Sequence, residues 1–113
     1  MIATATDLDW IVSRIVALCN PHIILLFGSY AKDAAHDRSD IDLLVVAPSR
    51  VPRSQRGREV MAVLAAFPSR FDVLFYTPEE MAEGRRDPSS FIAMVEPTAR
   101  VLWQSQEPLQ RLR

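Results

Sequence analysis

The chain alternates amphipathic stretches with short, wholly apolar runs. Between residues 8 and 19 hydrophobic side chains recur at helical spacing, and the capping oxygens and acids of residues 6–9 favour a helix start there. Apolar runs rich in strand-forming residues predict strands at 23–27, 40–46 and 71–76. The first part of the chain is therefore expected to form one helix and then strands separated by turns and helices.

Prolines divide the remaining segments into helices and one more short strand. We expect a helix over residues 52–66, weakened in its first half by Gly57. Shorter helices are expected after Thr77 and Asp87, where a capping residue precedes proline, and a small edge strand at 100–103. This order of elements predicts an α/β (α+β) fold, a small mixed sheet with flanking helices.

Length and composition indicate one globular domain. The chain has 113 residues, of which 49% are hydrophobic and 24% charged, with a net charge of −1. We place the domain at residues 1–104 and a tail without periodicity at 105–113. No apolar run is long enough to cross a membrane and no signal-peptide pattern is present, so we expect a cytoplasmic protein. Cys19, the single cysteine, is expected to be a buried, inert thiol.

Arginine dominates the basic residues. Twelve of the 13 are Arg, and four of these lie between Arg50 and Arg58. This cluster could bind a nucleotide, a nucleic acid or an acidic partner, or it could be the solvated face of a helix. The near-neutral overall charge argues against direct nucleic-acid binding.

Candidate chemistry is concentrated around the first two strands. Gly28 and Ser29 follow the strand at 23–27, where a glycine lets the backbone approach phosphate and a serine offers its amide and hydroxyl at a helix start. Ten residues later come Asp40 and Asp42, which project to the same face of a strand. Two carboxylates about 6 Å apart repel by roughly 3 kcal/mol, so a cation is expected between them, and magnesium suits carboxylates and phosphates.

Asp72 lies within the apolar run at 71–76, where an uncompensated charge is costly. If its strand lies beside that of Asp40 and Asp42, three carboxylates converge, enough for two metal ions. Two ions would activate a hydroxyl nucleophile and stabilise leaving pyrophosphate. Lys32, one helical turn after Ser29, could reach a phosphate.

Alternative explanations exist for each motif alone. Gly-Ser is usually an ordinary turn, and Asp-x-Asp usually begins a strand or belongs to a calcium loop. The apolar Leu43 and Val45 exclude the calcium loop, and a Walker-type Gly-Lys-Ser/Thr sequence is absent. The combination of strand, Gly-Ser, spacer, Asp-x-Asp, strand and Asp72 favours a catalytic site.

At these residues the sequence resembles the minimal nucleotidyltransferases of the DNA polymerase beta superfamily, whose signature is Gly-Ser, ten residues and Asp-x-Asp. Gly28, Ser29, Asp40 and Asp42 match this signature, Asp72 matches the third carboxylate, and the similarity covers about residues 8–104. The resemblance implies the polymerase-beta-like fold, Mg²⁺ and a nucleoside triphosphate such as ATP. It also implies that Asp40 and Asp42 hold both ions, and that Asp72 binds the catalytic ion and helps deprotonate the acceptor.

Small members of this family are commonly paired with a helical HEPN-domain toxin, and some transfer AMP to a tyrosine of that partner. The resemblance therefore implies an antitoxin that adenylylates its toxin. Our leading hypothesis is such a magnesium-dependent adenylyltransferase. The alternatives are a non-catalytic antitoxin that occludes its partner, and nucleotidyl transfer to a small molecule. The sequence does not specify the acceptor, the base or the oligomeric state.

Two residues depart from the family pattern. The family usually continues Gly-Ser-x-Ala with Arg-Gly, where this chain has Lys32 and Asp33. Lys32 keeps the charge but lacks the bidentate fork of arginine. Asp33 tolerates a left-handed turn but adds negative charge near the expected triphosphate, which weakens nucleotide binding.

Overall fold

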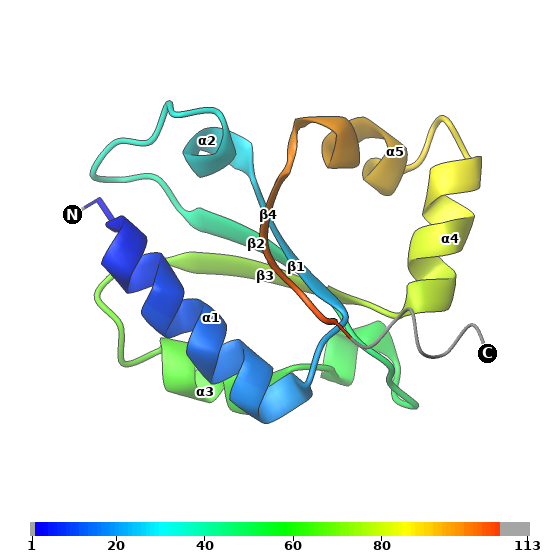
Figure 1. Cartoon of the computed structure of the whole chain (residues 1–113), viewed down its shortest axis with the longest axis horizontal. Helices are drawn as coiled ribbons and strands as arrows, with labels where there is room; N and C mark the ends of the chain where they lie inside the picture. Colours follow the sequence, from blue (N-terminus) through cyan, green and yellow to red (C-terminus); the bar gives the residue numbers. More distant parts are fainter. Residues whose placement is uncertain (1, 107–113) are drawn as a thin grey trace.

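The computed structural model describes residues 2–106, which form a four-stranded sheet with helices on both faces (Figure 1). The strands are β1 (Ile23–Phe27), β2 (Ile41–Val46), β3 (Phe71–Tyr76) and β4 (Arg100–Gln104). The α-helices are α1 (Ala5–Cys19), α2 (Gly28–Ala31), α3 (Arg58–Leu64), α4 (Pro78–Arg86) and α5 (Phe91–Val95). Two short 3₁₀ turns, Arg53–Gln55 and Glu96–Thr98, complete the described chain.

The sheet is mixed, with strand order β3-β2-β1-β4. Strand β1 is antiparallel to both β2 and β4, whereas β2 and β3 run parallel through the connection that contains α3. The predicted fold class, an α/β (α+β) mixed sheet with flanking helices, is therefore confirmed. Because β2 and β3 are parallel, both begin at the same end of the sheet.

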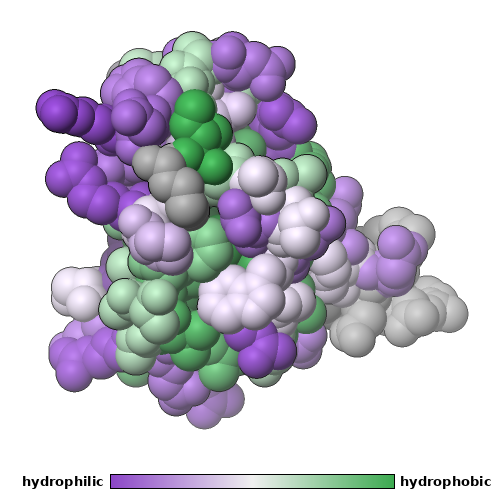
Figure 2. All heavy atoms as spheres, turned by 90° about the vertical axis from the view of Figure 1, so that its left-hand side faces the viewer, coloured by the Kyte–Doolittle hydropathy of each residue, from purple (hydrophilic) through white to green (hydrophobic). Residues whose placement is uncertain are grey.

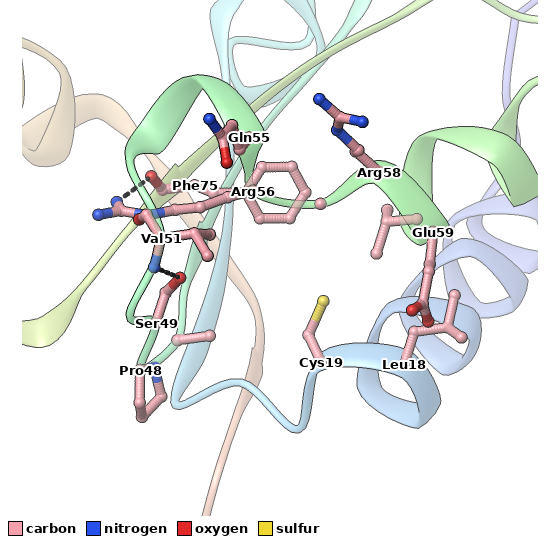
Figure 3. A pocket seen from close by; sticks show the side chains of 13 residues that line it. Leu18, Cys19, Pro48, Ser49, Val51, Gln55, Arg56, Arg58, Glu59 and Phe75 are labelled. Carbon is pink, nitrogen blue, oxygen red and sulfur yellow. Dashed lines mark hydrogen bonds between the residues drawn. The ribbon is translucent and has the colours of Figure 1, made fainter.

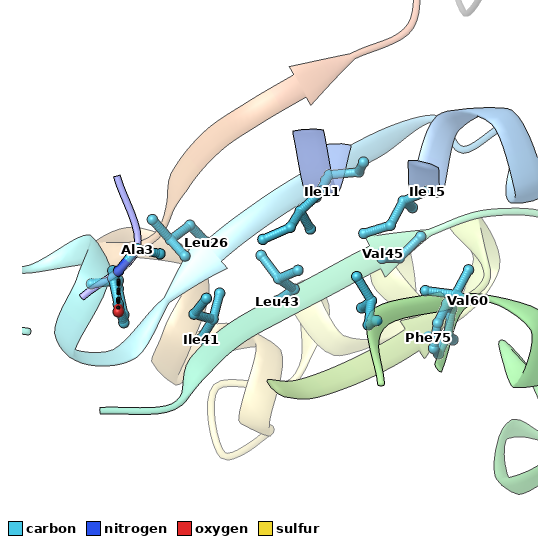
Figure 4. Close-up of a cluster of buried hydrophobic side chains, with 12 residues drawn as sticks. Ala3, Ile11, Ile15, Leu26, Ile41, Leu43, Val45, Val60 and Phe75 are labelled. Atoms are coloured by element: carbon cyan, nitrogen blue, oxygen red, sulfur yellow. Dashed lines mark hydrogen bonds between the residues drawn. The ribbon is translucent and has the colours of Figure 1, made fainter. Parts of the chain in front are cut away.

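Alternation along the strands divides the core into two layers. One face of the sheet lies against α1 and α3. Its side chains, which include Ile24, Leu26 and Leu43, form the larger core cluster with Ile11 and Ile15 (Figure 4). On the other face, Leu25, Leu44 and Val46 pack with Met81 of α4 and Ile92 of α5. The central strands β1 and β2 are thus covered on both faces, as their continuous apolar runs predict.

The first and fourth α-helices both begin at capping boxes. Thr77 and Glu80 satisfy each other's backbone amides at the start of α4, which confirms the predicted start of this helix. In α1 the cap is Thr4, paired with Asp7 in the same way, so the helix begins slightly earlier than residues 6–9 indicate. The helix ends at Asn20, which adopts a left-handed conformation.

The prediction of one helix over residues 52–66 is wrong. The segment divides into the 3₁₀ turn Arg53–Gln55 and helix α3, separated by Gly57 in a left-handed conformation (φ +76°). A Cβ on Gly57 would also collide with the ring of Phe75 beneath it. Gly57 therefore does more than weaken a helix, because its backbone turn and its closeness to β3 both require glycine.

Arg56, next to Gly57, fixes this turn against the sheet. Its guanidinium donates to the carbonyl of Phe75 at 3.1 Å and to both carboxylate oxygens of Glu80, at 2.6 and 3.2 Å. Its Nε also donates to the carbonyl of Val51 at 2.9 Å. The hydrogen bond from Arg56 is the main cause that lowers the pKa of Glu80 to about 2. Arg56 thus links the irregular segment to the start of α4.

The first residue of the predicted tail contacts the sheet. The amide of Ser105 donates to the carbonyl of His22 at 2.8 Å, which extends the contacts made by β4. Of the predicted tail, residues 107–113 lie outside the described residues. Within residues 2–106 no helix has the length and hydrophobicity needed to cross a membrane.

We predict that Glu80→Gln lowers the free energy of unfolding at pH 7 by about 1–2 kcal/mol, because the glutamine side chain still accepts from the amide of Thr77 but loses the charge that pairs with Arg56. The folded-state pKa of Glu80, about 2, lies below the ordinary value of 4.5, so this stabilisation is complete above pH 4.5 and disappears as the pH falls toward 2. Urea unfolding at several pH values measures it.

The matched control is Glu79→Gln, a neighbouring exposed carboxylate of the same helix turn. It should change the free energy of unfolding by no more than about 0.5 kcal/mol. A constant difference between Glu80→Gln and the wild type from pH 7 to pH 2 would contradict the assigned ion pair.

Candidate active site

The three predicted carboxylates lie at the end of the sheet where β2 and β3 begin. Asp40 immediately precedes β2, Asp42 is its second residue, and Asp72 is the second residue of β3. In the parallel pairing Asp42 lies directly opposite Asp72, so these two side chains project from the same face of adjacent strands. Figure 2 views this end of the molecule, where hydrophobic side chains reach the surface between hydrophilic ones.

Asp42 experiences the electrostatic cost of this arrangement. It is half-buried, and its pKa is raised first by burial, then by the charge of Asp72 and then by that of Asp40. Asp72 itself is exposed, contrary to the costly apolar setting expected from its neighbours in the sequence. Strand β3 lies at an edge of the sheet, and its apolar neighbours Phe71 and Val73 project to the opposite face, where they contact the larger core cluster.

Asp40 forms an ion pair with Arg70 and does not join the other two carboxylates. The Nε of Arg70 donates to its Oδ1 at 3.0 Å, and β2 begins one residue later than expected, at Ile41. Within residues 2–106 no group of three or more Asp, Glu, His or Cys side chains is close enough to hold a metal ion. The structure therefore brings Asp42 and Asp72 together, with Asp40 beside them but ion-paired.

Gly28 lies directly against Asp42. It is the first residue of α2, follows β1 in a left-handed conformation (φ +71°), and a Cβ there would collide with Oδ2 of Asp42. Phe27, the last residue of β1, pairs with Asp42 in the antiparallel register. Ser29 follows Gly28 and is half-buried. The Gly-Ser turn and the carboxylates, separate motifs in the sequence, are thus one site.

Lys32 and Asp33 lie just beyond this turn. Lys32 is exposed, with its amide donating to the carbonyls of Ser29 and Tyr30 at the end of α2. Asp33 adopts the left-handed conformation expected of it (φ +55°). Arg100 of β4 lies 3.6 Å from the carboxylate of Asp33, and this exposed pair offsets part of the added negative charge.

Three residues of the site are not identifiable from the sequence. Arg70 contacts Asp40, Arg100 contacts Asp33, and the buried hydroxyl of Tyr30 accepts a hydrogen bond of 3.0 Å from the amide of Ala3 (Figure 4). This last contact fixes α2 under the N-terminal segment. Each of the three depends on residues 27 to 67 positions apart in the chain, so no local pattern signals it.

A pocket of about 440 Å³ lies elsewhere, where α1 ends and α3 begins (Figure 3). None of the predicted site residues lines it. Cys19 points into this pocket, and its pKa is raised first by burial and then by the charge of Glu59, which keeps the thiol protonated. Arg56 also borders the pocket, but its guanidinium is paired with Glu80. At least this member of the Arg50 to Arg58 cluster is therefore not available to bind another anion.

The carboxylate pair suits a magnesium ion. Magnesium is usually held by one or two carboxylates, with waters and phosphate oxygens completing its shell. Asp42 and Asp72 could supply two such ligands, and their mutual repulsion favours a cation between them. Because Gly28 has no Cβ, the Gly-Ser turn can lie directly against the carboxylate of Asp42. Asp40 could add a ligand once it leaves Arg70.

Comparison with known families identifies the class of protein. The family described as "Polymerase beta, Nucleotidyltransferase" matches residues 11–84, which include Gly28, Ser29 and all three carboxylates. The chain belongs to this nucleotidyltransferase family. No curated protein matches the sequence of the chain.

Solved structures share the fold at low sequence identity. A toxin–antitoxin crystallised with AMP-PNP is 19% identical, with a TM-score of 0.55, over 91% of this chain and 78% of that one. A mutant of the toxin–antitoxin MntA-HpeT is 18% identical, with a TM-score of 0.57, over 92% and 78%. A second MntA-HpeT mutant is 17% identical, with a TM-score of 0.54, over 97% and 80%.

We predict that Gly28→Ala lowers the free energy of unfolding by about 1–3 kcal/mol, because the new methyl group meets Oδ2 of Asp42 and the positive φ is strained. In an Asp42→Ala background the collision is removed and only the backbone strain, about 1 kcal/mol, remains. Urea unfolding of the four proteins in this double-mutant cycle measures the coupling. Equal costs of Gly28→Ala in both backgrounds would show that the two residues do not interact.

We also predict that Asp42→Asn raises the free energy of unfolding of the metal-free protein at pH 7 by about 0.5–1 kcal/mol, because it removes a half-buried charge repelled by Asp72 and Asp40. Glu83→Gln, which neutralises an exposed carboxylate on α4, is the control and should change stability little. Thermal unfolding in the presence of EDTA compares them. A destabilised Asp42→Asn protein would mean that Asp42 is stabilised by contacts other than those described.

Proposed function

We propose that the protein is a magnesium-dependent nucleotidyltransferase that transfers AMP from ATP to a hydroxyl group of a protein partner. The observation that carries this proposal is the close approach of the Gly28 turn to Asp42, which itself lies opposite Asp72. A turn suited to phosphate and a pair of carboxylates suited to magnesium thus lie together at one end of the sheet. For the domain organisation, we propose that residues 1–104 form the nucleotidyltransferase domain and that residues 105–113 are a tail.

In this proposal Gly28 and Ser29 bind the β- and γ-phosphates of ATP through backbone amides and the serine hydroxyl, and exposed Lys32 adds a positive charge. Asp40, Asp42 and Asp72 would hold two magnesium ions, which would supply Lewis-acid stabilisation of the transferring phosphoryl group and of pyrophosphate. Asp72, exposed at the edge strand, takes the proton of the acceptor hydroxyl. The hydroxyl oxygen then bonds to the α-phosphorus as the bond to pyrophosphate breaks.

The proposed partner is a HEPN-domain toxin, which the protein inactivates as its antitoxin by modifying a tyrosine. The family resemblance motivates this partner, and the toxin–antitoxin structures that share the fold support it. The relative crystallised with AMP-PNP supports an adenine nucleotide as donor. One of the MntA-HpeT mutants carries glutamate in place of two aspartates two positions apart, the spacing of Asp40 and Asp42 here. We place the reaction in the cytoplasm, where ATP and Mg²⁺ are abundant.

The test is to incubate the purified protein with ATP labelled in the α-phosphate, Mg²⁺ and the product of its neighbouring gene. Label is expected on a tyrosine of the partner. It should disappear with Asp42→Asn, because this variant lacks a proposed metal ligand. The variant is expected to remain folded, so loss of label would not reflect unfolding. Magnesium omission and EDTA are the controls. No transfer by the wild type, or equal transfer by Asp42→Asn, contradicts the proposal.

A second candidate function is a non-catalytic antitoxin that binds its partner and occludes it. The pairing of Asp40 with Arg70 and the negative charge of Asp33 near the phosphate turn favour this candidate. The double variant Asp40→Asn with Asp42→Asn distinguishes the two. If it binds the toxin and still neutralises it in cells, occlusion suffices, whereas loss of neutralisation with retained binding supports catalysis.

A further inference from the structure

Arg70 is the one residue whose side chain contacts a predicted metal ligand by an ion pair within the described part of the chain. Its Nε donates to Oδ1 of Asp40 at 3.0 Å. The carbonyl of Arg70 accepts a hydrogen bond of 2.8 Å from the amide of Ile41, the residue after Asp40. The backbone therefore holds the start of β3 beside Asp40 whatever the side chain of Arg70 does.

The side chain of Arg70 lies largely in solvent. It is 80% exposed, whereas the side chain of Asp40 is 43% exposed. Among residues 2–106, the guanidinium of Arg70 donates a hydrogen bond to Asp40 alone. An arginine held by one exposed ion pair exchanges readily with solvent, since such pairs contribute little net stability. Arg70 can thus release Asp40 without disturbing the fold.

A metal ion that Asp40 helps to hold would share this carboxylate with Arg70. The proposed function gives Asp40 to the metal ions, yet its Oδ1 is occupied by a guanidinium. A divalent ion and a guanidinium bound to the same carboxylate repel each other, so each cation weakens the binding of the other at Asp40.

We propose that Arg70 competes with divalent metal ions for Asp40, so that it acts as the counter-ion of the carboxylates in the metal-free protein and leaves Asp40 when metal binds. This inference rests on the metal site of the proposed function. Arg70 is a positioning residue, since it acts through Asp40. Its ion pair sets how readily the site loads with metal, and removing it makes metal binding tighter.

The test is a titration of nucleotide-free protein with Mn²⁺, followed by electron paramagnetic resonance of the free ion. Arg70→Gln should bind Mn²⁺ roughly threefold to tenfold more tightly than the wild type, the range expected for loss of an exposed ion pair and of a nearby like charge. The control is Arg58→Gln, which removes the same charge from the exposed start of α3 and should leave the affinity unchanged.

Unchanged or weaker Mn²⁺ binding by Arg70→Gln overturns the competition, and so does equal tightening by Arg58→Gln, which would indicate a general charge effect. Thermal unfolding without metal checks folding, and the high exposure of Arg70 predicts a melting temperature near that of the wild type. If Asp42→Asn and Asp40→Asn bind Mn²⁺ as the wild type does, the metal site of the proposed function itself is wrong. If they lose Mn²⁺ while Arg70→Gln binds like the wild type, only the competition is wrong.

Discussion

The structure of the site depends on the contact between the Gly28 backbone and the carboxylate of Asp42. Antiparallel pairing of β1 with β2 brings the end of one strand onto the start of the other, and at that point only a residue without a side chain fits. The left-handed backbone of Gly28 begins α2 there. One packing constraint therefore fixes the distance between the group suited to phosphate and the group suited to metal.

The same end of the sheet concentrates negative charge that the fold itself does not need. Burial and the neighbouring Asp72 and Asp40 raise the pKa of Asp42, which is a cost to the folded state. Arg70 and Arg100 offset part of this charge from outside the apolar core, on Asp40 and Asp33. Both ion pairs are exposed, so each contributes little to the stability of the fold.

The opposite end of β3 is stabilised differently. There Arg56 joins an irregular turn, the carbonyl of Phe75 and Glu80 in a partly buried network. This network holds the start of α4, whose Met81 packs with Ile92 of α5 on the second face of the sheet. The partly buried polar contacts of Arg56 thus lie away from the carboxylates, and the exposed ion pairs of Arg70 and Arg100 lie beside them.

The sequence alone determined the helices, strands and site motifs whose signals come from residues close together in the chain. Strand periodicity, the capping box at Thr77 and the spacing from Ser29 to Asp40 are local properties of the chain, and they sufficed for the fold class and the family. The tertiary structure decided that Asp42 lies opposite Asp72, that Arg70 holds Asp40 and that Gly57 ends one turn and begins α3. These features depend on strand pairing and on contacts between distant residues, which helical or strand periodicity does not encode.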